Sequence, residues 1–284
     1  MTLWLSADAV DGWRPAPSGR PGGPRKFSDF AIETALTLRL VFRLPLRQTE
    51  GFLRSVLALL GTDLEAPDHT TLSRRSQRLD LALDRVPATG PLHLIVDSTG
   101  LSIVGEGEWA AAKHGKRGKR GWKKLHLGVD RCGVIVAQAV TESTADDATT
   151  GIDLIDQVDS DIASVTADAA YDTIAFYDAV GARGATVVVP PAKTASVSRR
   201  RPRSSARDRT ITRVKILGRR RWQKASGYQR QARVENAVFR YKSIIGDGLR
   251  ARTPAGRQTE ALLACNILNR MTELGRPASF AIGP

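Results

Sequence analysis

Two short apolar runs, each ending in an aspartate, stand out in the pattern of hydrophobic and polar positions. The first covers Leu92–Val96 and ends at Asp97, and the second covers Ile162–Ala167 and ends at Asp168. Runs of this length and composition predict buried strands. Because parallel neighbours lie about 4.8 Å apart, both carboxylates would meet at one edge of an α/β sheet, where binding sites form. Either aspartate alone could equally be a turn residue that closes its strand.

The same pattern predicts the rest of a sheet and its helices. Apolar and polar residues alternate over 122–130, and 134–140 is apolar beyond a glycine turn, which predicts a β-hairpin. A helix is predicted to begin near Asp146, a second to follow Asp168 and end near Val180, and a strand to follow at 186–189.

A third acid lies in a predicted amphipathic helix near the C-terminus. The apolar stripe of this helix consists of Val234, Val238, Tyr241 and Ile245. Helical spacing places Glu235 beside the stripe, on one face with Tyr228, Gln231 and Lys242. A lone glutamate among cations is usually an exposed helix acid. At the edge of an apolar stripe, however, partial burial of its charge would cost free energy.

The N-terminal part is predicted to be helical. Residues 1–26 are rich in Pro, Gly and Arg and are interpreted as a flexible lead-in. Helices are predicted at 28–44, at 49–61 and after Asp68, and the third carries three cations on one side, Arg74, Arg75 and Arg78. This favours a small helix-turn-helix-like DNA-binding domain at 27–86. A helical bundle with a solvated basic face fits the same pattern.

Charge indicates the class of partner. The 284 residues hold 43 Lys and Arg against 29 Asp and Glu, which gives a net charge of +14 and favours a polyanion, nucleic acid first. A membrane is disfavoured because no apolar run approaches about 20 residues, and no signal peptide is apparent. The two cysteines lack metal-ligand spacing, which indicates a reducing cytoplasm.

Two segments concentrate the positive charge. Residues 193–224 contain thirteen Lys or Arg and one acid, and 113–121 is a glycine-spaced run of cations. Solvated charge runs are common, but this density exceeds what solubility needs and favours phosphate contact.

The three acids, together with the spacing of Tyr228, Glu235 and Lys242, resemble the DDE transposases of the bacterial insertion-sequence-five family. The resemblance covers about 44–274, with matching segments at 44–52, 67–72, 96–100, 105–109 and 164–168. The family signature Tyr-x2-Arg-x3-Glu-x6-Lys departs at Gln231, where arginine is expected. Arg230 is the expected substitute, because it reaches the face of Glu235 more easily than Arg233 does.

This resemblance implies an α/β protein with an RNase H-like catalytic core at 90–274, built on a mixed five-stranded sheet flanked by helices, with 275–284 as a tail. Asp97 would lie on the first strand, Asp168 after the fourth, and Glu235 on a C-terminal helix. Three converging carboxylates repel one another unless cations neutralise them, and oxygen ligands select Mg²⁺ or Mn²⁺. Two such ions would support cleavage at insertion-sequence ends and strand transfer into target DNA.

The expected partners are the terminal inverted repeats of the element and target DNA, bound by a homodimer or higher oligomer in the bacterial cytoplasm, in association with the nucleoid. The expected DNA contacts are Lys124, Tyr228, Arg230, Arg233 and Lys242, with Arg74, Arg75 and Arg78 from the N-terminal domain. Two alternatives stay open: an RNase H-like nuclease that cuts without joining, and an inactive DNA-binding remnant. The presence of all three acids argues against the remnant.

Overall fold

The computed structural model describes residues 6–16, 25–84, 90–105, 121–198 and 205–275. These residues form two compact units. The first comprises Met1–Ala82 with Arg250–Ile267, and the second comprises Leu83–Leu249 with Leu268–Pro284. No helix among the described residues is long and apolar enough to cross a lipid bilayer.

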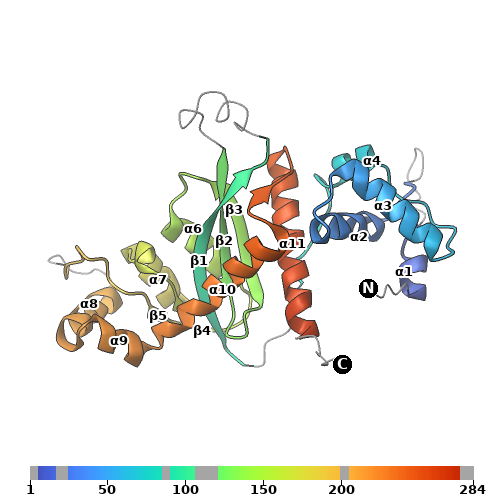
Figure 1. The fold of residues 1–284 in the computed structure, drawn as a ribbon. Helices are drawn as coiled ribbons and strands as arrows, with labels where there is room; N and C mark the ends of the chain where they lie inside the picture. Colours follow the sequence, from blue (N-terminus) through green and yellow to red (C-terminus); the bar gives the residue numbers. More distant parts are fainter. Residues whose placement is uncertain (1–5, 17–24, 85–89, 106–120, 199–204, 276–284) are drawn as a thin grey trace, which may run out of the picture. The chain divides into compact units, whose positions relative to one another are not determined.

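One mixed sheet forms the centre of the second unit (Figure 1). Its strands are β1 (Leu92–Ile103), β2 (Trp122–Val129), β3 (Ile135–Glu142), β4 (Ile162–Thr166), β5 (Thr186–Val188) and β6 (Gly248–Leu249). Their order is β3-β2-β1-β4-β5, and β6 pairs with the end of β1. The pairs β1–β2 and β2–β3 are antiparallel, whereas β1–β4 and β4–β5 are parallel. The predicted RNase H-like core and its five strands are confirmed, and β6 is a short addition.

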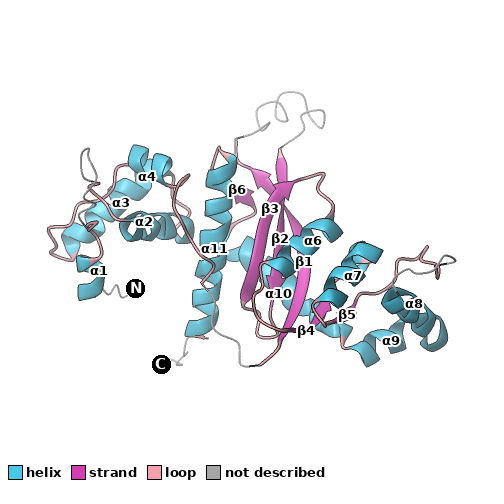
Figure 2. Ribbon diagram, turned by 180° about the vertical axis from the view of Figure 1, so that it is seen from behind, coloured by secondary structure: helices cyan, strands magenta, loops and turns pink. Residues whose placement is uncertain are grey.

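Helices cover both faces of this sheet. Three of them are α6 (Asp147–Asp156), α7 (Ile174–Ala182) and α10 (Ala232–Arg240). Helices α6 and α7 lie on the face seen in Figure 2, and α10 lies on the opposite face, seen in Figure 1. Leu94 and Val96 are fully buried in the core that α6 and α7 cover, where each such side chain contributes about 1.5–3 kcal/mol. Because side chains alternate along a strand, Asp97 points toward the face that α10 covers.

The basic segment 193–224 is largely helical where the structure describes it. It contains α8 (Ser205–Leu217) and α9 (Arg219–Ser226). The sequence did not predict these helices, because charged residues dominate both and the buried apolar residues, Ile211 in α8 and Trp222 in α9, are too few to give a helical period. The other basic run, 113–121, lies almost wholly outside the described residues.

Short helices build the first unit, and their boundaries follow their caps. They are α1 (Ala7–Asp11), α2 (Asp29–Val41), α3 (Leu46–Leu59) and α4 (His69–Arg75). The Ser28 hydroxyl accepts a hydrogen bond from the backbone of Ala31 at the start of α2, and Asp68 caps α4 in the same way. The predicted order of three helices after residue 27 is therefore confirmed.

The interpretation of residues 1–26 as a flexible lead-in is wrong for 6–16. This stretch contains α1, and the Trp13 side chain is buried, with 3% of its surface exposed. Its indole N–H donates to the carbonyl of Glu65 at 2.8 Å, and the Ser28 hydroxyl donates to the carbonyl of Gly12 at 2.6 Å. One large aromatic residue with a satisfied polar atom is enough to fix this proline- and glycine-rich segment.

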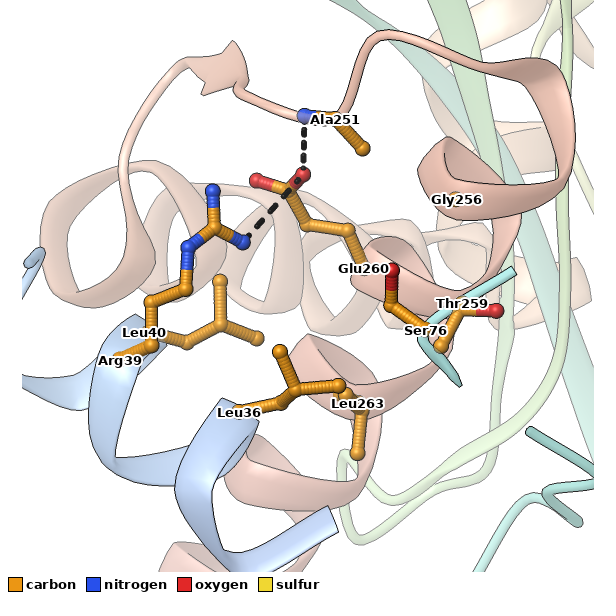
Figure 3. A pocket seen from close by; sticks show the side chains of 9 residues that line it. All are labelled: Leu36, Arg39, Leu40, Ser76, Ala251, Gly256, Thr259, Glu260 and Leu263. Carbon is orange, nitrogen blue, oxygen red and sulfur yellow. Dashed lines mark hydrogen bonds and ion pairs between the residues drawn. The ribbon is translucent and has the colours of Figure 1, made fainter. Parts of the chain in front are cut away.

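The first part of α11 (Pro254–Leu274) also belongs to the first unit, whereas the predicted catalytic domain covered residues 90–274 without a break. Glu260 accepts hydrogen bonds from the backbone N–H groups of Arg250 and Ala251, and its carboxylate lies 3.9 Å from the guanidinium of Arg39 on α2 (Figure 3). Burial of such a charge requires these partners. They therefore fix the segment beginning at residue 250 against α2.

Candidate active site

The three predicted carboxylates lie near one another in the second unit. In the parallel pair β1–β4, Ile95 faces Thr166, so Asp97 and Asp168 occupy equivalent positions two residues further on. Helix α10, which carries Glu235, packs against β1 and β2. Burial raises the pKa of Asp97 to about 6, and the negative charges of Asp168 and Glu235 contribute to this rise. The structure therefore brings together the trio that the sequence singled out.

Each aspartate uses one oxygen to fix its own backbone. Oδ1 of Asp97 accepts the N–H of Ser98 at 2.8 Å. Oδ1 of Asp168 accepts the N–H of Ala170 at 2.8 Å and thereby caps the 3₁₀ turn η2 (Ala169–Tyr171). Among the described residues, no hydrogen bond occupies the second oxygen of either carboxylate. Both aspartates are thus oriented while an oxygen stays available for a ligand.

Gln231 fixes the start of α10 beside Asp97. Its amide nitrogen donates to the carbonyl of Val96 at 3.2 Å, and Glu235 follows one helical turn later. The prediction that Gln231 and Glu235 share one face is wrong, because Gln231 is 5% exposed whereas Glu235 is exposed. The reason is local: 228–231 forms a 3₁₀ turn, η3 (Tyr228–Gln231), with a different rotation per residue from the α-helix.

Arg230, the expected substitute for the family arginine, has its side chain packed over Gly227. A Cβ atom at Gly227 would lie 3.5 Å from Cζ of Arg230, so the Arg230 side chain folds back over that glycine. Its positive charge helps burial to lower the pKa of His93, four residues before Asp97 on β1. The exposed Arg230 side chain stays a predicted phosphate contact.

The sequence did not single out a fourth acid, Asp147, which is the first residue of α6. Its Oδ1 lies 3.1 Å from Nζ of Lys124 and 3.7 Å from Nδ1 of His126, and its charge contributes to the raised pKa of Asp97. Lys124 and His126 are two apart on β2 and so share a face of the sheet. The contact of Asp147 with these two residues could have been predicted from their shared face and from an acid at the start of the next helix.

Lys124 has an internal role in this structure. Besides Asp147, its ammonium group donates to the carbonyl of Ala145 at 2.7 Å. His126 is fully buried, its Nε2 lies 2.8 Å from the hydroxyl of Thr141, and burial lowers its pKa. The predicted contact between Lys124 and DNA would have to compete with these bonds.

Among the other predicted DNA contacts, Tyr228 lies near the trio. The ring of Tyr228 packs on Trp222, with 6.3 Å between centroids. Burial raises the pKa of Tyr228, and the charges of Asp168 and Glu235 raise it further. Lys242 is half-buried in the π-helical turn η4 (Tyr241–Ile245), and no hydrogen bond or ion pair joins its ammonium group to any described residue. Arg233 is exposed.

The three N-terminal cations do not form the predicted helical row. Helix α4 ends at Arg75, so Arg78 lies beyond it and not on its face. Arg75 binds the carboxylate of Asp29 and the carbonyl of Phe27. Arg74 is exposed. Serine at the C-cap and the polar residues that follow shorten this helix, an effect that the charge spacing did not reveal.

The donor set fits a hard divalent cation. Asp97, Asp168 and Glu235 offer only carboxylate oxygens, and the charges of described residues that shift the pKa of the partly buried Asp97 are those of acids. Within the described residues, no group of three or more His, Cys, Asp or Glu side chains is close enough to ligate a single ion. The carboxylates would therefore have to converge on a cation, and Mg²⁺ and Mn²⁺ are the ions that suit them.

Comparison with known protein families identifies the family of this chain. One family model described as a transposase DDE domain matches residues 1–106, and a second with the same description matches 88–270, more than half of the chain. The second match contains all three carboxylates and the sheet that positions them. These models do not name the insertion-sequence-five family but are compatible with it. The chain belongs to the DDE transposases.

Proposed function

We propose that this protein cleaves DNA strands at the ends of an insertion sequence and joins the freed 3′ ends to target DNA. The observation that carries the proposal is the placement of Asp97, Asp168 and Glu235 together by β1, the end of β4 and α10. Acids that come from three distant segments and lie near one another are expected for phosphoryl transfer, and the backbone hydrogen bonds of Asp97 and Asp168 use only one oxygen of each.

Each residue has a distinct part in the proposed reaction. Asp97, Asp168 and Glu235 would hold two divalent ions, which when bound supply activation of the attacking oxygen and stabilisation of the leaving 3′ oxygen. The free ammonium of Lys242 would bind a DNA phosphate, and the Tyr228 ring on Trp222 would pack against the nucleotide. Water serves as the nucleophile in cleavage and a 3′-hydroxyl in joining, so no covalent protein–DNA intermediate is required.

We further propose that α8 and α9 extend the DNA-binding surface. Their exposed cations include Arg213, Lys215, Arg220, Arg221 and Lys224. Phosphate neutralisation by such cations supplies affinity without reading sequence. Sequence-specific binding of the terminal inverted repeats is proposed for the helices of the first unit, with Arg74 as the exposed cation of α4. Assembly of a homodimer or higher oligomer on DNA, in the nucleoid of a bacterial cytoplasm, belongs to the same proposal.

Lys242→Ala should weaken binding to element-end DNA and reduce the slope of log K against log salt by about one unit. The reason is that one phosphate contact releases about one counterion. The measurement is a fluorescence-anisotropy titration at several salt concentrations. Arg270→Ala is the matched control, because Arg270 is an exposed cation already paired with Glu273. Equal slopes for wild type and Lys242→Ala would remove Lys242 from the DNA contacts.

The test of the proposed function uses labelled DNA that carries the terminal repeats from either side of the gene, unlabelled target DNA and Mg²⁺. A transposase gives both cleaved ends and joined product. A nuclease gives cleaved ends alone, and an inactive remnant binds the repeats without cutting them. Cleavage without any joined product, even from pre-cleaved ends, would overturn the strand-transfer proposal.

A further inference from the structure

Phe239 of α10 is a large apolar side chain that is exposed to solvent. It is 68% exposed, more than any other aromatic side chain that the structure describes. The buried side of the same helix holds Val234 and Ala237. A single exposed apolar residue is common on protein surfaces and needs no function by itself. What distinguishes Phe239 is the set of side chains around it.

Polar side chains surround Phe239 on the outer face of α10. Residues three and four positions away are neighbours on a helix surface, and here they are Glu235, Asn236, Lys242 and Ser243. Within the described part of the chain, no hydrogen bond or ion pair engages the side chains of Glu235, Asn236 or Lys242. The exposed ring therefore lies among a carboxylate, an amide and an ammonium group that are all available to a ligand.

Glu235, Phe239 and Lys242 form what we call the outer row of α10. Phe239 lies about 6 Å beyond Glu235 along the helix axis, and Lys242 lies about 4 to 5 Å further on. Helix α10 packs against β1 and β2 and lies along the sheet in Figure 1. Because its buried stripe faces these strands, the outer row faces away from them. A DNA strand with its cleaved phosphate at Glu235 and another phosphate at Lys242 passes over Phe239.

The composition of this face fits a nucleotide better than a second protein. Phe239 is the only large apolar side chain that α10 exposes among the described residues, whereas protein interfaces are marked by contiguous apolar patches. A nucleotide offers a phosphate to the ammonium group of Lys242 and a flat base to the Phe239 ring. Stacking of a base on an aromatic ring does not depend on which base it is.

A cleaved DNA end offers a base that is ready to stack. Within a duplex, the neighbouring bases cover both faces of each base. At a cleaved end, the terminal base has one open face, and this base lies next to the phosphate or hydroxyl group that reacts. The position of Phe239, one helical turn from Glu235, matches the position of that open face.

We propose that Phe239 stacks on the terminal base of the cleaved element end and holds that end beside the carboxylates until it is joined to target DNA. This inference rests on the proposed function, since it requires a DNA end at Asp97, Asp168 and Glu235. The ring distinguishes a cleaved end from uncut DNA, because in uncut DNA the next base covers the face on which Phe239 stacks.

The experiment measures the Kd of the full-length chain for three DNAs by fluorescence anisotropy. They are a pre-cleaved element end, the same end with its terminal nucleotide abasic, and uncut DNA that continues beyond the end. Ca²⁺, a hard cation that carboxylates bind, replaces Mg²⁺, and the DNA is recovered afterwards to verify that no strand has been cut. The variants are Phe239→Ala, Phe239→Trp and, as the matched control, Leu274→Ala, which changes an apolar residue 69% exposed at the end of α11.

We expect Phe239→Ala to weaken binding to the pre-cleaved end about tenfold or more and to bind uncut DNA within twofold of wild type. On the abasic end, wild type and Phe239→Ala should bind equally, because the stacking partner is absent. Phe239→Trp should keep the affinity of wild type for the pre-cleaved end, and Leu274→Ala should match wild type on all three DNAs. The urea midpoint of Phe239→Ala should be unchanged, since the side chain is exposed.

A Kd of Phe239→Ala for the pre-cleaved end within twofold of wild type would overturn the inference. So would an equal loss of affinity on the pre-cleaved and abasic ends, because the base would then not be the partner of Phe239. Dissociation of a DNA-free oligomer by Phe239→Ala in sedimentation velocity would assign the ring to a contact between copies of the chain and would also overturn it. Failure of the proposed function is distinct: wild type would then give neither cleaved nor joined DNA with Mg²⁺.

Discussion

Asp97→Asn, Asp168→Asn and Glu235→Gln should each reduce Mg²⁺-dependent DNA cleavage by about a thousandfold or more, with DNA binding retained or slightly tighter. Each substitution removes one carboxylate charge and keeps the shape of the side chain. Loss of a metal ligand forfeits several kcal/mol of transition-state stabilisation, and each 1.36 kcal/mol corresponds to tenfold in rate. Loss of a negative charge also reduces repulsion of phosphate. The measurement is single-turnover cleavage of labelled element-end DNA.

The stability of Asp97→Asn separates lost chemistry from lost folding. The pKa of Asp97 in the folded protein, about 6, lies above its ordinary value of 3.8. Between these values the folded state holds a proton that the unfolded state has released, so stability falls as pH rises from about 4 to about 6. Asparagine does not titrate, so the Asp97→Asn variant does not lose stability in this way as pH rises. We expect Asp97→Asn to be more stable than wild type at pH 7 without metal, by about 1–2 kcal/mol, and equally stable below pH 4.

Added Mg²⁺ should reverse this order, because it binds and stabilises wild type but not the variant. The control for the cleavage assay is Asp178→Asn, which changes an exposed acid of α7. Retained Mg²⁺-dependent cutting in any one of the three variants would remove that residue from the site. If wild type were more stable than Asp97→Asn at pH 7 without metal, the charged Asp97 carboxylate would not destabilise the folded protein.

Asp172→Ala should destabilise the second unit by about 3–5 kcal/mol, the largest stability effect that we expect from a single charge. The carboxylate side chain is 1% exposed and accepts the Arg207 guanidinium through two hydrogen bonds. Its removal leaves the Arg207 charge, at 16% exposure, without its partner and also orphans the N–H of Ala192. Urea unfolding followed by circular dichroism measures the loss.

Two further variants assign the effect to the ion pair. Asp178→Ala should change stability by less than about 0.5 kcal/mol, because the acid is exposed on the same region of the chain. Adding Arg207→Met to Asp172→Ala should recover part of the lost stability, since it removes the unpaired charge while it keeps apolar volume. A double variant that is less stable than Asp172→Ala alone would show that Arg207 stabilises α8 by contacts other than this pair.

Much of the core could be predicted from the sequence because local patterns encode it. The two apolar runs before Asp97 and Asp168 became parallel neighbours, and the amphipathic helix delivered Glu235 to the same place. The alternating stretch after residue 122 became the β2–β3 hairpin. In each case the periodicity of side chains directly reflects which face is buried. The candidate carboxylates Asp97 and Glu235 lie within β1 and α10, and Asp168 lies two residues after β4, so their placement follows from these elements. The predicted strand end at Asp97 is wrong, because β1 continues through pairing with β2 and β6 to Ile103.

The features that the sequence did not reveal depend on contacts between distant residues. Burial of Gln231 follows from a 3₁₀ turn and a bond to Val96, 135 residues away. The roles of Asp147 and Lys124 follow from the approach of α6 to β2, which no local pattern reports. Polar residues whose partners are distant in the sequence are thus the part of the site that could not be predicted from the sequence.

The central claim is that Asp97, Asp168 and Glu235 hold the same divalent cations. The most direct measurement replaces Mg²⁺ with Fe²⁺, adds ascorbate and hydrogen peroxide, and maps where the hydroxyl radicals formed at the ion cut the protein backbone. The account predicts cuts beside all three residues, which lie in three separate segments of the chain, and their joint loss in Asp97→Asn. Cuts confined to other segments, or an unchanged pattern in Asp97→Asn, would contradict it.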